Sequence, residues 1–354
     1  MTKKVFTPIR VGNMTLDHRF AMAPMTRSRA TFEGVQTPLA AEYYGQRAAD
    51  MGLVITEAVQ PSLQAQGNNN TPGIYTPEQV AAWQSVTKAV HDNGGYLFMQ
   101  IQHAGRLTHP ENAAPRPAAI APSAVAPEGQ IFTPNGPRDV PVPNEATKAD
   151  LENVVAEFRL AARRAIDAGA DGVEIHGGHS FLLHQFFGET SNVRQDEYGG
   201  SIENRIRFVL EVVAAVVDEI GADKTAIRLS PFHSRSTIDE GENGTALYVL
   251  LMEKLNDMKL AYVHLVLQEA TALLTTLREK FIGPLVVNFE GQPLDMRLEA
   301  VESGLVDMLT IGTLSLANPD FVARVKADAP FNEPDFSTTF GRGAQGYTDY
   351  PTLG

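Results

Sequence analysis

The feature that most constrains the fold is the regular recurrence of short apolar runs, each long enough for one β-strand. Eight such runs lie at residues 20–25, 53–59, 96–102, 172–176, 225–230, 262–267, 285–289 and 308–312. Most of them lack the alternation of apolar and polar residues that marks a half-exposed strand. Continuous apolar runs are typical of parallel strands that are buried on both faces. The sequence therefore predicts a buried parallel sheet.

Segments with apolar residues at helical spacing separate these runs. They cover residues 38–50, 77–91, 148–168, 201–220, 245–258, 271–280, 293–303 and 318–327. Several carry a start or stop signal, such as Pro77 after Thr76, or Gly169 after the third helix. This alternation predicts an α/β fold with a single (β/α)8 TIM barrel, rather than an open doubly wound sheet. We expect one domain over residues 1–354.

Three segments lie outside the alternation. Residues 3–6 and 14–16 flank a Gly12-Asn13 turn and predict an N-terminal hairpin that lids one end of the barrel. The Pro-rich segment 103–144 follows the third strand and is too long for a minimal loop, so we expect it over the catalytic face. The Gly- and aromatic-rich end, 331–354, is expected to pack there too.

Composition excludes several classes of function. A net charge of -13 argues against a nucleic-acid or anionic-membrane surface. The absence of Cys excludes disulfides and Cys-ligated metals. The start has no apolar signal core, and no run approaches the ~18 apolar residues of a membrane span. We expect a cytoplasmic monomer or homodimer that acts on a small molecule.

Mostly polar residues lie where the predicted strands end. The residues at these ends are Pro24-Met25-Thr26, Glu57, Ala58, Gln100, Gln102, His176, His179, Arg228, Asn288 and Thr313. The carboxyl ends of barrel strands converge on one face, so these residues predict one pocket, suited to a polar planar ring. His176 and His179 are the first candidates for catalysis, although one could cap the strand and the other lie in the core. The competing enzyme class is a zinc hydrolase on the same barrel. It would need a third metal ligand beside the two histidines, and the sequence offers none that is suitably placed.

The ordered motifs resemble those of the old yellow enzyme family of FMN-dependent NAD(P)H oxidoreductases. The resemblance runs along nearly the whole chain. It rests on APMTR at 23–27, HAGR at 103–106, the histidine motif, LHQF at 183–186, DEYGGS at 196–201, RLSPF at 228–232, ANPD at 317–320 and GYTDYP at 346–351. Several of these, such as DEYGGS, have a sufficient structural explanation in loop hydrogen bonding.

The resemblance implies how FMN is held. Thr26 would bond the flavin near C4=O and N5, Gln100 its pyrimidine edge, and Arg228 the region of N1 and C2=O. Apolar contact with the ring would come from Pro24, Met25 and Ala58, and the phosphate end would include Asn288, Gly312 and Thr313.

The resemblance also implies the reaction, which is reduction of the activated C=C bond of an α,β-unsaturated carbonyl compound with NAD(P)H. His176 and His179 would hold the carbonyl oxygen. Hydride addition to the β-carbon places charge on that oxygen, and two fixed donors would stabilise it as an oxyanion hole does.

Two departures from the family qualify these roles. Phe181 stands where the family usually has the Tyr that protonates the α-carbon. At the phosphate end, Thr313 and the Asn288–Glu290 stretch replace an Arg and a Gly-rich turn. Unless Arg324 or Arg342 reaches the phosphate, we expect FMN to be weakly bound or lost. The segments 233–243 and 339–343 also differ from the family's pattern.

The departures keep two alternatives open. Because Phe181 cannot protonate the intermediate, the scaffold could instead catalyse isomerisation or cyclisation of an enone. Because Thr313 and Glu290 weaken the phosphate site, the chain could also be a flavin-free binding protein or pseudoenzyme.

Overall fold

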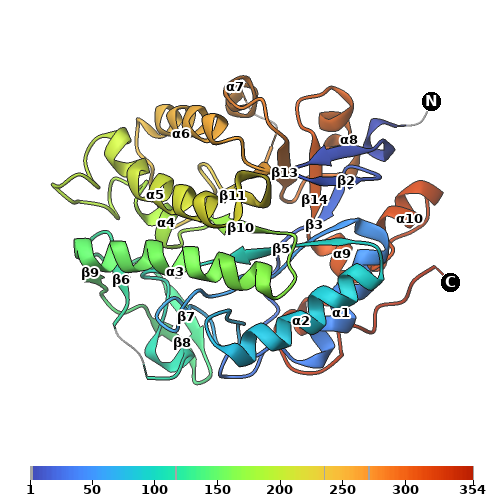
Figure 1. Ribbon diagram of the computed structural model, residues 1–354, viewed down its shortest axis with the longest axis horizontal. Coiled ribbons are helices and arrows are strands. Elements are labelled where there is room, and N and C mark those ends of the chain that lie inside the picture. Colours follow the sequence, from blue (N-terminus) through green and yellow to red (C-terminus); the bar gives the residue numbers. More distant parts are fainter. Residues whose placement is uncertain (1–2, 116–117, 235, 270–271, 354) are drawn as a thin grey trace.

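A computed structural model of the chain, which describes residues 3–115, 118–234, 236–269 and 272–353, contains a closed barrel of eight parallel strands (Figure 1). The strands are β3 (Phe20–Met22), β4 (Leu53–Ile55), β5 (Tyr96–Ile101), β10 (Gly172–His176), β11 (Thr225–Leu229), β12 (Tyr262–Leu267), β13 (Leu285–Phe289) and β14 (Met308–Ile311). Pairing of β14 with β3 closes the ring. The predicted barrel is confirmed, and every predicted run contains its strand.

Helices surround the strands (Figure 1). They are α1 (Pro38–Met51), α2 (Pro77–Asp92), α3 (Lys148–Asp167), α5 (Ile202–Ile220), α6 (Gly244–Met258), α7 (Ala272–Lys280), α8 (Leu294–Glu302) and α10 (Phe321–Ala327). Thr76 and Thr147 begin α2 and α3 with capping boxes, which satisfy backbone N–H groups at the helix ends. The predicted start of α7 at Thr271 lies outside the described residues. Two short helices were not predicted: α4 (Leu182–Gln185) and α9 (Thr313–Ala317).

The interior of the barrel changes from apolar to polar toward its carboxyl end. Phe98 and Tyr262 pack against each other near the start of their strands, with ring centroids 5.4 Å apart. Two residues further along the same strands, on the same face, lie Gln100 and His264. Opposite Phe98 only glycine fits, because a Cβ at Gly172 would lie 2.3 Å from the Phe98 ring. An apolar plug thus supports a polar layer above it.

The N-terminal hairpin exists, but its first strand was predicted at the wrong residues. Ile9–Val11 (β1) pairs with Met14–Leu16 (β2), whereas Lys4–Phe6 forms a 3-10 helix. A two-residue turn at Gly12-Asn13 pairs the residues immediately beside it, which leaves residues 3–6 too far away. Val11, Met14 and Leu16 pack with Leu53 and Phe98, so the hairpin closes the amino end of the barrel.

The long segment after β5 forms small local structures rather than one loop. It contains η2 (Pro110–Asn112), the pair β6 (Ile120–Ala121) and β9 (Asn144–Glu145), and the hairpin β7 (Gln130–Thr133) and β8 (Gly136–Asp139). Arg106 anchors it to the carbonyl groups of Val125 and Thr237. It therefore contacts the loop after β11, but none of its described residues lines the central cavity.

The C-terminal segment packs beside the residues that follow β3, as expected. Arg27 donates hydrogen bonds to the carbonyl groups of Thr339 and Gly346. Arg29 donates to the carbonyl groups of Thr339 and Gln345. Tyr347 is fully buried. None of the described helices has the length and apolar character needed to cross a membrane.

Candidate active site

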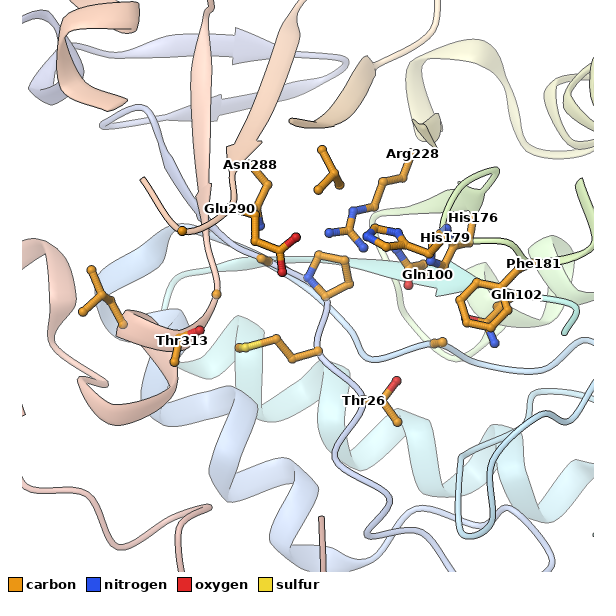
Figure 2. Close-up of a pocket in the computed structure, with 18 of the residues that line it drawn as sticks. Thr26, Gln100, Gln102, His176, His179, Phe181, Arg228, Asn288, Glu290 and Thr313 are labelled. Atoms are coloured by element: carbon orange, nitrogen blue, oxygen red, sulfur yellow. The ribbon is translucent and has the colours of Figure 1, made fainter. Parts of the chain in front are cut away.

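A cavity of about 400 Å³ opens at the carboxyl end of the barrel (Figure 2). It brings together most of the predicted site residues, and it adds five that were not predicted. Its lining includes Pro24, Met25, Thr26, Ala58, Gln100, Gln102, His176, His179, Phe181, Arg228, Asn288, Glu290, Gly312 and Thr313. The added residues are Ala23, Val266, Gly291, Arg297 and Leu314.

The two histidines are held by a tight loop after β10. The Nδ1 atom of His176 accepts a hydrogen bond from the Gly178 N–H (3.3 Å), so its ring proton is on Nε2. The His179 N–H donates to the Ser230 hydroxyl (2.7 Å), while His179 itself adopts a left-handed φ of 50°. A Cβ at Gly178 would lie 2.7 Å from that same hydroxyl, so the close approach requires glycine. These bonds fix the ring of His176 and the backbone of His179.

Both imidazoles are uncharged at neutral pH. Burial lowers the pKa of His176 and of His179 well below its ordinary value, and the nearby charge of Arg228 lowers both further. A neutral imidazole with its proton on Nε2 is a hydrogen-bond donor at that atom. His176 can therefore present a donor at Nε2 without a charge of its own, and His179 adds a second neutral imidazole.

Arg228 is a buried cation whose guanidinium makes no hydrogen bond to any described residue. Its Nε is completely enclosed. Burial lowers its pKa to about 10, which still leaves it charged at neutral pH. Buried charges ordinarily have partners. The cavity wall thus offers a guanidinium for an electron-rich group on a ligand, which fits the N1 and C2=O region of a flavin.

Beneath the cavity lies a polar network that was not predicted. Gln100 donates from Nε2 to Glu174 Oε1 (2.7 Å), which leaves the Gln100 amide oxygen as an acceptor. Glu174 Oε2 also bonds with His264 Nδ1 (2.9 Å), and His264 Nε2 bonds with the Thr310 hydroxyl (2.9 Å). Burial alone would raise the pKa of Glu174, but His264 and Arg228 bring it below its ordinary value. The ionised carboxylate therefore balances Arg228.

Glu57 has a structural role instead of a place in the cavity. Its carboxylate accepts from the Arg27 N–H (3.0 Å), the Ser28 N–H (3.3 Å) and the Gln36 amide (3.1 Å). These bonds hold the backbone just after Thr26, which lines the cavity. Glu57 thus shapes the loop that presents Thr26.

Phe181 lies beside the histidine pair. Its ring is 5.0 Å from that of His176, at an interplanar angle of 64°, and it lines the cavity. A benzyl side chain has no acidic proton. The consequence for proton delivery stays a prediction.

On the side of the cavity away from the histidine pair lies Thr313, and Figure 2 shows Asn288 and Glu290 between Thr313 and Arg228. Neither of the two arginines considered as substitutes reaches this side. Arg324 bonds with Asp320 and with the carbonyl groups of Pro330 and Pro351. Arg342 lines a separate pocket beside Arg29.

Arg297, in the first turn of α8 after β13, also lines the cavity. Sequence reasoning missed it because an Arg on a helix is usually an exposed surface residue. The available signal was its position one turn into the helix that follows the seventh strand. Within the part of the chain that the structure describes, no three His, Cys, Asp or Glu side chains are placed to hold a metal ion.

Comparisons with known proteins agree with this site. The model of the NADH:flavin oxidoreductase / NADH oxidase family matches residues 4–332. A putative 12-oxophytodienoate reductase 11 from Oryza sativa subsp. japonica is 40% identical, over 99% of this chain and 98% of its own. A probable flavin mononucleotide-dependent alkene reductase from Leishmania infantum is also 40% identical, over 98% and 96%.

Solved structures give the same answer. Morphinone reductase superposes with a TM-score of 0.94 at 36% identity, covering 100% of this chain and 97% of its own. The old yellow enzyme homologue from Zymomonas mobilis has a TM-score of 0.94 at 35% identity, covering 99% and 100%. A further morphinone reductase structure holds tetrahydroNAD. These findings confirm the predicted resemblance, enzyme class and cofactor, and the chain belongs to the FMN-dependent NADH:flavin oxidoreductase / NADH oxidase family.

Proposed function

We propose that this chain is an ene-reductase, which reduces the activated C=C bond of an α,β-unsaturated carbonyl compound with NAD(P)H. The observation that carries the proposal is the placement of two neutral imidazoles, His176 and His179, in the same cavity as the unpartnered guanidinium of Arg228. This arrangement combines donors for a substrate oxygen with a cation for an electron-rich ring.

The residues of the cavity fit the FMN ring. FMN supplies the hydride when it is bound. Arg228 would hold the pyrimidine end, and the free amide oxygen of Gln100 would accept from a ring N–H. Thr26 offers a hydroxyl at the wall beside Pro24 and Met25, which supply apolar contact. The protein thereby positions the ring and sets its electrostatic surroundings.

The histidine pair would bind and polarise the substrate. Hydride addition at the β-carbon moves electron density onto the carbonyl oxygen, and His176 and His179 would donate to it from Nε2. Donors that are already fixed need no reorganisation as this charge develops, which is the basis of oxyanion stabilisation. Because the imidazoles are neutral, they would stabilise the oxygen without first protonating it.

Proton delivery to the α-carbon would come from solvent. Phe181 occupies the position beside His176 and has no proton to give. A placed general acid typically contributes ~10²- to 10⁴-fold in rate, so its absence would slow this step. An enolate that waits for its proton could instead rotate about the former C=C bond and lose the added hydride again. The enone would then be isomerised without net reduction, which favours isomerisation as a second candidate activity.

The test is anaerobic titration of the purified protein with NADPH, followed by addition of 2-cyclohexenone. The proposal expects the flavin absorbance to bleach with NADPH and to recover with the enone, with one saturated ketone formed for each NADPH consumed. An enone that isomerises without consumption of NADPH would instead support the second candidate. Bleaching without any recovery would overturn both.

A further inference from the structure

We propose that Arg297 supplies the cation that binds the phosphate of FMN. This proposal deepens the proposed function and rests on it. FMN is a long ligand with a ring at one end and a phosphate at the other. Figure 2 shows Thr313 set apart from Arg228, on the side of the cavity away from the histidine pair. With Arg228 assigned to the ring, the phosphate needs a second cation, and Arg297 is the other arginine among the described residues that line the cavity. It follows β13, which pairs with β14, the strand that leads to Thr313.

The bonding of Arg297 leaves it ready to bind an anion. Its Nε donates to the Gln292 carbonyl (2.8 Å), which fixes the orientation of the guanidinium. Its two terminal nitrogens have no hydrogen-bond partner among residues 3–115, 118–234, 236–269 and 272–353. A guanidinium held at Nε with both terminal nitrogens free has the fork geometry that matches two phosphate oxygens.

The surroundings of Arg297 strengthen its attraction for an anion. The residue is half-buried, and burial lowers its pKa from the ordinary value without removing the charge at neutral pH. A partly desolvated cation gains more from an ion pair than a fully solvated one does. Helix α8 positions Arg297 through its backbone hydrogen bond to the Pro293 carbonyl (3.3 Å).

The one acidic group in this part of the cavity lining, Glu290, is bonded elsewhere. Its Oε2 lies 2.6 Å from Nε2 of His233, on the loop after β11. That bond directs the carboxylate toward His233. Asn288 and Thr313 add a neutral amide and a hydroxyl to the cavity lining. The phosphate would therefore contact one cation and two neutral hydrogen-bonding groups. We expect these groups to bind it more tightly than Thr313 alone would.

The experiment compares FMN with riboflavin, which has the same ring but no phosphate. The apoprotein and its Arg297→Gln and Arg297→Lys variants are titrated with each flavin, and quenching of flavin fluorescence gives the dissociation constants. Loss of a charge-assisted, bidentate contact should weaken FMN binding roughly 10- to 100-fold in Arg297→Gln. Riboflavin binding should not change, and Arg297→Lys should fall between. Melting temperatures of the apoproteins check that the variants are folded.

Arg342→Gln is the matched control, because it removes the same charge from a different pocket. FMN binding should be unchanged in it. Equal loss of FMN and riboflavin in Arg297→Gln would assign Arg297 a structural role and overturn the proposal, as would an unchanged affinity for FMN. Wild-type protein that takes up neither flavin would refute the proposed function itself. Tight FMN binding by both wild type and Arg297→Gln would refute only the role of Arg297.

Discussion

The imidazole rings of His176 and His179 lie edge to face, with centroids 5.4 Å apart and planes inclined by 74°. Two rings so close and so inclined can direct donors at one acceptor atom. We predict that replacing either residue by Ala lowers turnover of an enone by on the order of 10²- to 10³-fold, as loss of one oxyanion donor does. Steady-state kinetics with NADPH and 2-cyclohexenone would measure the loss.

The control for this prediction is His91→Ala, which removes an imidazole on α2 that bonds with Asp171 and is partly exposed. Its kinetics should match wild type. If the double variant of His176 and His179 retained full turnover with the flavin bound, the pair would be structural.

Phe181 gives a second prediction, about proton delivery. A Tyr hydroxyl at this position, beside the His176 ring, would add a general acid to the cavity. We expect Phe181→Tyr to raise the rate of enone reduction at saturating NADPH. Products made in deuterated water by the wild type should carry deuterium at the α-carbon with weak facial preference. Strict deuteration of one face by the wild type would reveal another fixed donor and contradict proton delivery by solvent.

The barrel could be predicted because parallel strands that are buried on both faces consist of consecutive apolar residues. Each of the predicted apolar runs contains a strand. The N-terminal hairpin could not be placed so well. Residues 3–6 contain strand-favouring Val5 and Phe6, but the two-residue turn decides which residues pair. The short α9 was missed because it directly follows β14, without a loop to separate the two patterns.

The site could be predicted in part because the topology brings strand ends together, whatever their separation in sequence. Glu174 and His264 were missed for a different reason. They lie inside apolar runs, and their bond appears only when the register of β10, β11 and β12 is known. Arg297 is on a helix, so its approach to the cavity depends on how α8 packs after β13, which no local pattern records.

Arg228 provides a third prediction, in which stability and function oppose each other. Its folded-state pKa is about 10, below the ordinary value of 12.5, so the unfolded chain binds its proton more tightly. The cost of burying the charge is fully present below pH 10 and declines as the pH rises toward 12.5. Arg228→Met should therefore stabilise the apoprotein at neutral pH by about 1 to 3 kcal/mol. Both FMN and riboflavin should bind more weakly, because both carry the ring.

Arg47 is the control for Arg228, because it is equally buried but donates to the carbonyl groups of Tyr43, Ser315 and Leu316. Arg47→Met should destabilise the protein, since it leaves these acceptors unsatisfied. Thermal melting of the apoproteins measures both effects. A lower melting temperature for Arg228→Met would show that its charge is compensated in the folded apoprotein.

The histidine pair also predicts how stability depends on acid. The folded-state pKa of His176 and of His179 lies well below the ordinary value of 6.5, chiefly because of burial. Between the folded value and 6.5 the unfolded chain binds more protons, so stability falls as the pH drops below about 6.5. Each histidine should contribute up to about 1.4 kcal/mol per pH unit in that window. Urea unfolding of apoprotein at several pH values should therefore give a shallower acid decline for the His176→Gln, His179→Gln variant. Equal declines in the two proteins would mean that burial does not lower the pKa of either imidazole in the folded state.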